Sequence, residues 1–141
     1  MDVAGIYLPR RATRLSRPVI MWRIPAGFPS PADDYVEGRI DLNRDLIKHP
    51  LATFYIRVDG DSMEPRIHAG ALIVVDRMAE TKDDDIVVAR LGSEFMVKKL
   101  HIEKDGCIWL VSENRAYPPI PVTEGVDFEV WGRVMHSIQS Y

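Results

Sequence analysis

The chain has few residues of the kinds that build covalent or metal-bound scaffolds. It contains one cysteine, Cys107, which excludes an internal disulfide and indicates a reducing compartment. Its four histidines show no short metal-binding spacing, so neither a metal site nor another cofactor is predicted. No apolar run near the N-terminus is long enough for a signal or membrane segment, because residues 5–8 are followed by Pro9 and two arginines. We therefore expect a cytoplasmic protein that is not attached to a membrane.

Charge is distributed unevenly along the 141 residues. The formal net charge is -3, yet residues 1–26 carry five arginines and a single acidic residue, Asp2. A basic arm of this kind is expected to be attracted to the acidic remainder of its own chain or of a second copy. Contact with nucleic acid is the other interpretation, but the remainder shows no recognition helix with basic periodicity.

Prolines, glycines and charged residues divide the chain into segments. Residues 1–33 contain five prolines and no regular periodicity, which predicts an extended arm. Loosely recurring apolar residues indicate a short helix within residues 35–47. From Thr53 onward β-rich segments dominate, so the predicted fold class is mostly β, a compact antiparallel domain with an extended N-terminal arm. The expected strands are residues 54–58, 71–75, 86–91, 94–100, 107–112 and 128–136.

One hairpin presents a lysine that suits acid-base chemistry. Gly92-Ser93 between two strands predicts a two-residue type II′ turn. On the second strand Lys98 shares a face with Met96 and Leu100, whereas Lys99 points to the opposite face. An ordinary lysine has a pKa of about 10.4, and burial among hydrocarbon lowers it because the charged amine is disfavoured there. A neutral Lys98 would be able to act as a general base.

A serine at a turn is the second candidate for chemistry. Ser62 stands in the sequence Gly60-Asp61-Ser62-Met63, a polar corner after an apolar strand. A serine that leads into a short helical segment lies near free backbone N-H groups, including its own, which can hold an oxyanion. A serine hydroxyl and a neutral lysine amine together support acyl transfer. The non-catalytic interpretations are that Ser62 is an ordinary turn residue and that Lys98 extends its amine to water. The spacing of the two residues alone leaves both interpretations open.

A series of motifs in a fixed order carries a resemblance to a known family. They are Ala26 to Ala32, His49-Pro50, Gly60 to Met63, Leu72 to Asp76, Asp85 to Ala89, Glu94 to Leu100, and Asn114 with Tyr117-Pro118. In order and spacing they resemble UmuD-type proteins, in the family that also includes the LexA repressor and phage repressors, all self-cleaving Ser-Lys peptidases. The resemblance implies Ser62 as the nucleophile, Lys98 as the general base and Ala26-Gly27 as the bond cut. It also implies an arm removed by self-cleavage (1–26), an extended linker (27–52) and a peptidase domain (53–141).

The same resemblance implies a role in the SOS response to DNA damage. A RecA filament on single-stranded DNA is expected to stimulate cleavage. The processed homodimer is expected to join a UmuC-like Y-family DNA polymerase in error-prone translesion synthesis. Only 26 residues precede the expected cleavage site, too few for the DNA-binding domain of a LexA-like repressor, so no sequence-specific DNA binding is expected.

Other functions remain as alternatives to this prediction. The nearest is a relative of the LexA-like self-cleaving transcriptional repressors. A non-enzymatic interaction module with the same fold is a second class. A signal-peptidase-like enzyme that acts on other chains is a third, and the lack of an expected membrane anchor counts against it. The sequence also leaves open whether the arm is cut by its own chain or by a second copy, since the tether suits both.

Overall fold

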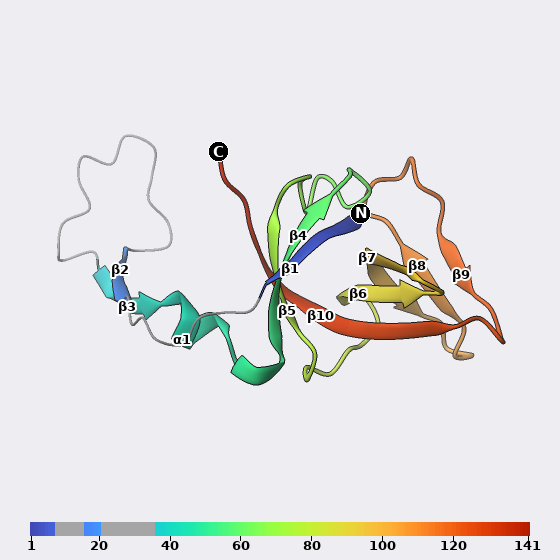
Figure 1. Ribbon diagram of the computed structural model, residues 1–141, viewed down its shortest axis with the longest axis horizontal. Helices are drawn as coiled ribbons and strands as arrows, with labels where there is room; N and C mark the ends of the chain where they lie inside the picture. Colours follow the sequence, from blue (N-terminus) through green and yellow to red (C-terminus); the bar gives the residue numbers. More distant parts are fainter. Residues whose placement is uncertain (8–15, 21–35) are drawn as a thin grey trace. The chain divides into compact units, whose positions relative to one another are not determined.

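The structure is a computed structural model that describes residues 1–7, 16–20 and 36–141, with side chains from 1–7 and from 39 onward (Figure 1). The chain divides into two compact units, one formed by residues 1–9 with 49–141 and the other by residues 10–48. The expected cleavage site, Ala26-Gly27, lies outside the described residues. Within the described ranges, no helix has both the length and the apolar character needed to cross a membrane.

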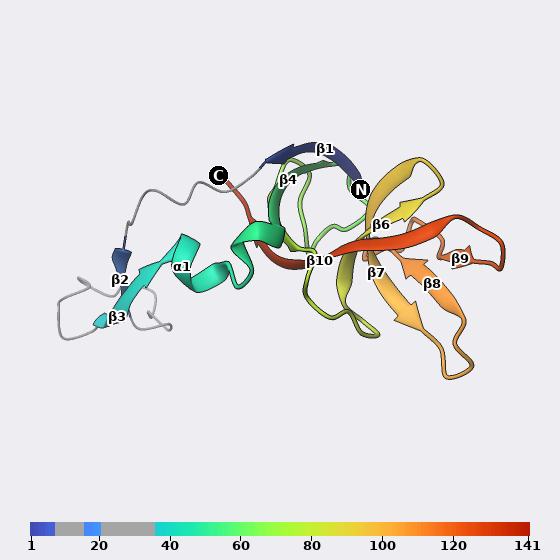
Figure 2. The ribbon, with the colours of Figure 1, turned by 60° about the horizontal axis from the view of Figure 1, so that its bottom comes forward.

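The larger unit is a single antiparallel sheet. Its strands are β1 (Asp2–Tyr7), β4 (Thr53–Asp59), β5 (Leu72–Asp76), β6 (Ile86–Leu91), β7 (Glu94–Ile102), β8 (Ile108–Val111), β9 (Ile120–Val122) and β10 (Phe128–Ile138). They follow the order β1-β4-β5-β10-β6-β7-β8-β9. A further pairing of Asp2 in β1 with Met96 in β7 closes the sheet on itself, and Figures 1 and 2 show β1 beside β4. The prediction of a mostly β, antiparallel domain is confirmed.

Apolar side chains from both ends of the sheet fill its interior. One cluster draws on β4, β5, β6 and β7, and it includes Met1 and Met63. A second cluster gathers around Leu110 of β8. Removing such side chains from water contributes about 1.5–3 kcal/mol for each large aliphatic group. Because Met63 is fully buried, the residue directly after Ser62 is anchored in the core, and this anchors the turn that carries the serine.

The long strand β10 joins the two halves of the closed sheet. Residues 128–133 pair with β6 and residues 133–138 pair with β5, with a register shift in each half (Figure 2). Such bulges bend a strand and increase its twist. At the first shift, a Cβ on Gly132 would approach Val75 Cγ1 to 2.6 Å, so the close packing of β10 on β5 requires a glycine there.

In its described residues, 16–20 and 36–48, the smaller unit contains a pair of antiparallel strands and one short helix. Strand β2 (Ser16–Ile20) pairs with β3 (Val36–Asp41), and α1 spans Leu42–Leu46. The side chain of Asp41 caps α1 by accepting from the amides of Asn43 (3.1 Å) and Arg44 (3.4 Å). The helix expected within residues 35–47 is therefore shorter than predicted, because residues 36–41 pair with β2 as a strand instead.

The strand predictions from residue 53 onward hold closely, whereas the sequence analysis predicted no strand within the arm. All six expected strands are present, with no end shifted by more than two residues. The turn at Gly92-Ser93 is confirmed, since Leu91 pairs with Glu94 and Gly92 has a φ of +60°. The arm is expected to be extended, and β1 and β2 within it are extended strands that the sequence analysis did not identify as strands. Their partner strands supply the pairing, which the local sequence does not indicate.

Candidate active site

The turn after β4 presents Ser62. Gly60 has a φ of +82°, a left-handed conformation that glycine adopts at little cost, and it redirects the chain at the end of the strand. The amide of Glu64 donates to the carbonyl of Asp61 at 3.1 Å, which closes a tight turn around the serine. The Ser62 residue is only 2% exposed. The burial of Met63 then holds this turn against the core.

Lys98 reaches Ser62 from the middle of β7. It is 6% exposed, and its Nζ lies 2.9 Å from Ser62 Oγ, a hydrogen-bonding distance across 36 residues of sequence. The neighbouring Lys99 points to the other face, where its amine pairs with Glu113 at 3.6 Å. The structure thus brings together the two side chains that the sequence singled out, while Ala26 and Gly27 lie outside the described residues.

The loop after β8 fixes the serine turn in place. The amide of Asn114 donates to the carbonyl of Ser62 at 2.9 Å, and its side-chain Nδ2 donates to the carbonyl of Asp61 at 3.2 Å. The Tyr117 hydroxyl donates to the Asp61 carboxylate, and the Tyr117 ring centroid lies 5.8 Å from Lys98 Nζ. Sequence analysis gave Asn114 and Tyr117 no function beyond their place in the family resemblance. We call these contacts of Asn114 and Tyr117 with the serine turn the clamp. A hydrogen bond to a backbone carbonyl leaves no pattern in the sequence, so the clamp could not have been predicted from it.

The contact between Tyr117 and Asp61 makes the clamp measurable. Asp61 accepts the phenol hydrogen and its negative charge opposes the phenolate, so the pKa of Tyr117 is raised above its ordinary value of 10.0. We expect Asp61→Asn to bring this pKa back towards 10.0. The phenolate absorbance of the intact chain, with that of Tyr117→Phe subtracted, measures the change. An unaltered titration in Asp61→Asn contradicts the contact.

The first residue of the chain also lies at this site. The Met1 amine donates to Ser62 Oγ, and the Met1 carbonyl accepts from the amide of Val97 at 2.9 Å. Burial, followed by the hydrogen bond and charge of Lys98, lowers the pKa of the Met1 amine from 8.0 to about 5. In this position the amine is therefore neutral at neutral pH. Sequence analysis did not place Met1 here.

A cavity of about 220 Å³ opens beside the serine and lysine. It lies between the serine turn, the start of β1 and the loop after β8, on the side from which the Met1 amine contacts Ser62 Oγ. The lining residues are Met1, Asp2, Gly60, Asp61, Ser62, Met96, Lys98, Tyr117 and Ile120.

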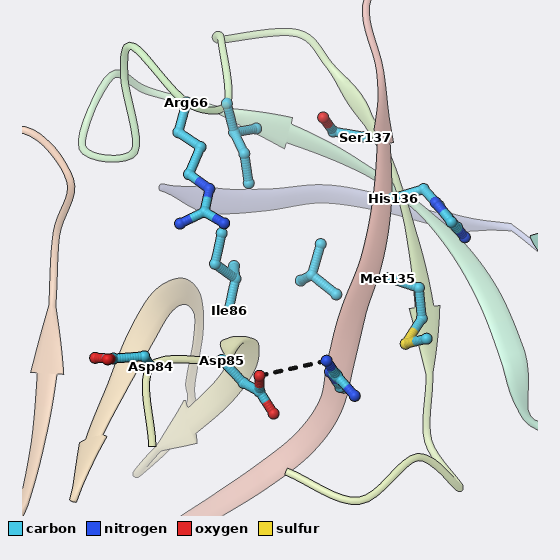
Figure 3. A pocket seen from close by; sticks show the side chains of 10 residues that line it. Arg66, Asp84, Asp85, Ile86, Met135, His136 and Ser137 are labelled. Atoms are coloured by element: carbon cyan, nitrogen blue, oxygen red, sulfur yellow. Dashed lines mark ion pairs between the residues drawn. The ribbon is translucent and has the colours of Figure 1, made fainter. Parts of the chain in front are cut away.

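Another cavity, of about 270 Å³, lies elsewhere on the sheet (Figure 3). Arg66 approaches it from one side and Asp85 from the opposite side, with Asp84 also at its edge. Asp85 is paired with Arg133 at 3.4 Å. Neither Ser62 nor Lys98 lines this cavity, so it is separate from the candidate active site.

Two exposed clusters in the described part of the chain bring possible metal ligands together. Asp83 and Asp84 lie near His101, and Glu103 lies near Asp105 and Cys107. Hydrogen bonds to backbone amides hold one carboxylate in each cluster. Asp83 accepts from the Ile102 amide at the end of β7 and Asp105 from the Cys107 amide, at 2.8 and 2.9 Å. The Asp105 contact is a local turn of a kind that forms without a metal ion.

Comparison with known proteins identifies the family. The model of the Peptidase S24-like family matches residues 18–135, so the chain belongs to this family of peptidases. Protein SamA of Salmonella typhimurium is 43% identical over 124 residues, 87% of each chain. Protein MucA of Escherichia coli is 42% identical over 127 residues, 87% of this chain and 84% of MucA. LexA repressor 1 of Pseudomonas putida is 35% identical over 122 residues, 84% of this chain and 59% of that protein. The family predicted from the sequence motifs is confirmed.

Proposed function

We propose that the protein is a self-cleaving serine peptidase that cuts its own Ala26-Gly27 bond, with Ser62 as nucleophile and Lys98 as general base. The observation that carries this proposal is the 2.9 Å separation of Lys98 Nζ and Ser62 Oγ, with both residues nearly inaccessible to solvent. Membership of a peptidase family supports the class of reaction. The cavity beside the two side chains supports the access of a peptide bond.

The chemistry proceeds in two balanced steps. Neutral Lys98 takes the proton of Ser62 as Oγ attacks the carbonyl carbon of Ala26, and the protonated lysine then gives that proton to the nitrogen of Gly27 as the C-N bond breaks. In the described part of the chain the Ser62 amide donates to no other group, so it can hold the oxyanion. Water then cleaves the ester between Ser62 and Ala26, which releases the Ala26 carboxylate and restores the hydroxyl.

The wider role that we propose is in SOS mutagenesis. A RecA filament on single-stranded DNA raises the fraction of molecules whose scissile bond occupies the cleft, and cleavage follows that fraction. The processed form then acts in the cytoplasm as a homodimer that serves a UmuC-like Y-family polymerase in translesion synthesis. Similarity to MucA and SamA over most of the chain supports this branch of the family.

A LexA-like repressor is the second candidate. The 35% identity to LexA repressor 1 favours it, although the matched region covers only 59% of that protein. A repressor must bind a specific duplex sequence, so retention of operator DNA by the chain in a gel shift distinguishes it from the first candidate.

Incubation at alkaline pH tests the proposed reaction without any partner. A general base accepts a proton only in its neutral form, so the rate of cleavage is expected to rise from pH ~7 towards ~10. Docking of the Met1 amine is favoured as the pH rises towards 8.0, because the amine has a pKa of 8.0 when free and about 5 when docked, so the slope is read above pH ~8. Mass spectrometry is expected to show fragments 1–26 and 27–141. A flat pH profile contradicts a lysine base, and an intact chain supports a non-enzymatic module.

A substitution at the bond itself provides the control. Gly27→Glu is expected to block cleavage, because the backbone must approach Ser62 closely and the new side chain prevents it. Ser93→Glu adds the same group at the exposed turn of the β6-β7 hairpin and is expected to cut normally. Equal cleavage of both variants would place the scissile bond elsewhere.

A further inference from the structure

Strand β1 lies in the groove that leads to the serine and lysine. It pairs antiparallel with β4 over five residue pairs that run from Asp2 opposite Asp59 to Tyr7 opposite Tyr55. At its start, Asp2 also pairs with Met96 of β7, and the Met1 carbonyl accepts from the Val97 amide. The chain's own residues 1–7 therefore add a strand between β4 and β7 directly beside Ser62. Main-chain pairing of this type is a common way to hold an extended peptide.

The direction of β1 shows which part of a substrate it resembles. Strand β4 runs towards Ser62, so the antiparallel β1 begins at Ser62 and runs away from it. Its first nitrogen, the Met1 amine, contacts Ser62 Oγ. When a serine cleaves a peptide bond, the nitrogen that leaves the attacked carbon belongs to the residue after the bond. β1 therefore lies where the segment that follows a scissile bond would lie, with Met1 in the place of the leaving residue.

We infer that the groove between β4 and β7 binds the segment on the leaving-group side of the scissile bond, and that β1 fills this groove until it is displaced. This inference rests on the proposed self-cleavage. The Met1 side chain is 5% exposed and packs in the core cluster with Met63, so β1 is anchored at the end nearest Ser62. While β1 is docked, residues 27 and beyond have no access to the same groove.

The contacts of β1 favour reversible docking. Asp2 lies opposite Asp59, and like charges in directly opposed positions destabilise an antiparallel pair. The register of β1 shifts between Val3 and Gly5, and Ile6 at its far end is half-exposed. Burial of the Met1 side chain and main-chain pairing oppose these costs. The balance suits a strand that can leave the groove without unfolding the sheet.

Chain length does not keep the scissile bond away from Ser62. Residues 8–25 between β1 and Ala26 can span up to about 60 Å when extended. The six residues of β1 extend only about 20 Å from the serine. The bond can therefore reach the site by length while β1 remains docked. The scissile bond is kept from Ser62 because β1 occupies the groove that the residues after the bond would need.

A reversible disulfide tests this occupancy. Asp2 and Asp59 are paired and both exposed, so cysteines at both positions can be joined with β1 docked. Cys107, which is exposed, is replaced by serine in the same chain. At pH ~9, above the ordinary pKa of an N-terminal amine, we expect the oxidised chain to cleave at least about a hundredfold more slowly than the reduced chain. Asp2→Cys alone is the control and is expected to respond to neither oxidant nor reductant.

The outcomes separate this inference from the proposed function. Equal cleavage by the oxidised and reduced chains overturns the inference and leaves the proposed function standing. A disulfide that joins two chains on a non-reducing gel overturns the assignment of the groove to the chain's own β1. Absence of cleavage in every chain, the unaltered one included, overturns the proposed function, and the inference falls with it.

Deletion of the strand provides the opposite test. Removal of residues 2–7 is expected to raise the partner-free rate about tenfold if β1 is docked in about nine molecules out of ten. Removal of residues 9–14 shortens the arm equally, keeps β1 and is expected to give no such increase. A denaturant unfolding curve checks that each deletion variant folds. A folded chain without β1 that cleaves no faster than its control overturns the inference, and the disulfide test decides if that chain does not fold.

Discussion

Ser62→Ala is expected to abolish self-cleavage, both at alkaline pH and with a RecA filament. The alanine removes the only atom that we propose attacks the Ala26 carbonyl. Loss of a serine nucleophile in other serine peptidases costs up to about 10⁶-fold in rate. The hydroxyl accepts hydrogen bonds from Lys98 and from the Met1 amine, so the variant also leaves two buried donors without this acceptor. That loss costs about 1–3 kcal/mol of stability and leaves the fold intact.

A matched serine isolates the effect of the nucleophile. Ser93→Ala alters an exposed turn residue of the β6-β7 hairpin and is expected to cleave at the normal rate. Time courses of fragment appearance, with an unfolding curve for each variant, provide the comparison. Residual cutting by folded Ser62→Ala at the normal bond would remove Ser62 from its proposed role.

Lys98→Arg is expected to be nearly as damaging. A guanidinium keeps its charge at every accessible pH, so it cannot take the proton from Ser62. General-base catalysis typically contributes about 10²–10⁴-fold, and a loss of at least this size is expected. The decisive measurement is the pH profile, because Lys98→Arg is expected to remain inactive at pH ~10, where the unaltered chain cleaves fastest.

The adjacent lysine gives a close control for this variant. Lys99 lies on the same strand but points to the other face, and its amine pairs with Glu113 at 3.6 Å. Lys99→Arg keeps the positive charge next to that carboxylate, so cleavage and its pH profile are expected to be unchanged. If both variants lost activity equally, the effect would belong to the strand and not to the base.

The surroundings of the two side chains explain how a reactive pair is held still. Met63, directly after the serine, is buried in the core. Asn114 donates to the backbone carbonyls of the serine turn, and Tyr117 donates to the side chain of Asp61 in the same turn. A catalytic group gains from such support because proximity contributes only when the geometry is fixed. In this site, the core and a single loop provide that support from opposite sides.

The prediction of the strands succeeded where the local residue pattern is typical of a strand. The strands that became β5 and β6 are runs of β-branched residues bounded by glycine, aspartate or proline, and such runs form strands wherever their faces can be buried. The prediction failed for β9, a three-residue strand that contains Pro121. It also failed for β1, which contains Gly5 and precedes an arm rich in proline and arginine. Both depend on a neighbouring strand more than on their own residues.

The candidate site, like the fold, could be predicted from the sequence only in part. The alternation of β7 separates Lys98 from Lys99 and the glycine turn isolates Ser62, so both could be chosen from local geometry and the family motifs. Neither observation predicts the distance between Lys98 Nζ and Ser62 Oγ, whose residues are 36 positions apart in the sequence. The clamp from Asn114 and Tyr117, and the presence of Met1 on Ser62, depend on contacts between segments distant in sequence.

Local residue order was thus sufficient for the class of fold, the approximate strands, the family and the choice of serine and lysine. The fold class and the strands follow from short-range preferences, namely side-chain alternation, turn glycines and apolar runs, whereas the family and the choice of the two residues rest on the resemblance of ordered motifs. The folded chain alone set the closure of the sheet, the 2.9 Å approach of the lysine to the serine and the docking of β1 beside them. Those features arise from long-range strand pairing and burial, whose energies depend on partners that no local stretch of residues specifies.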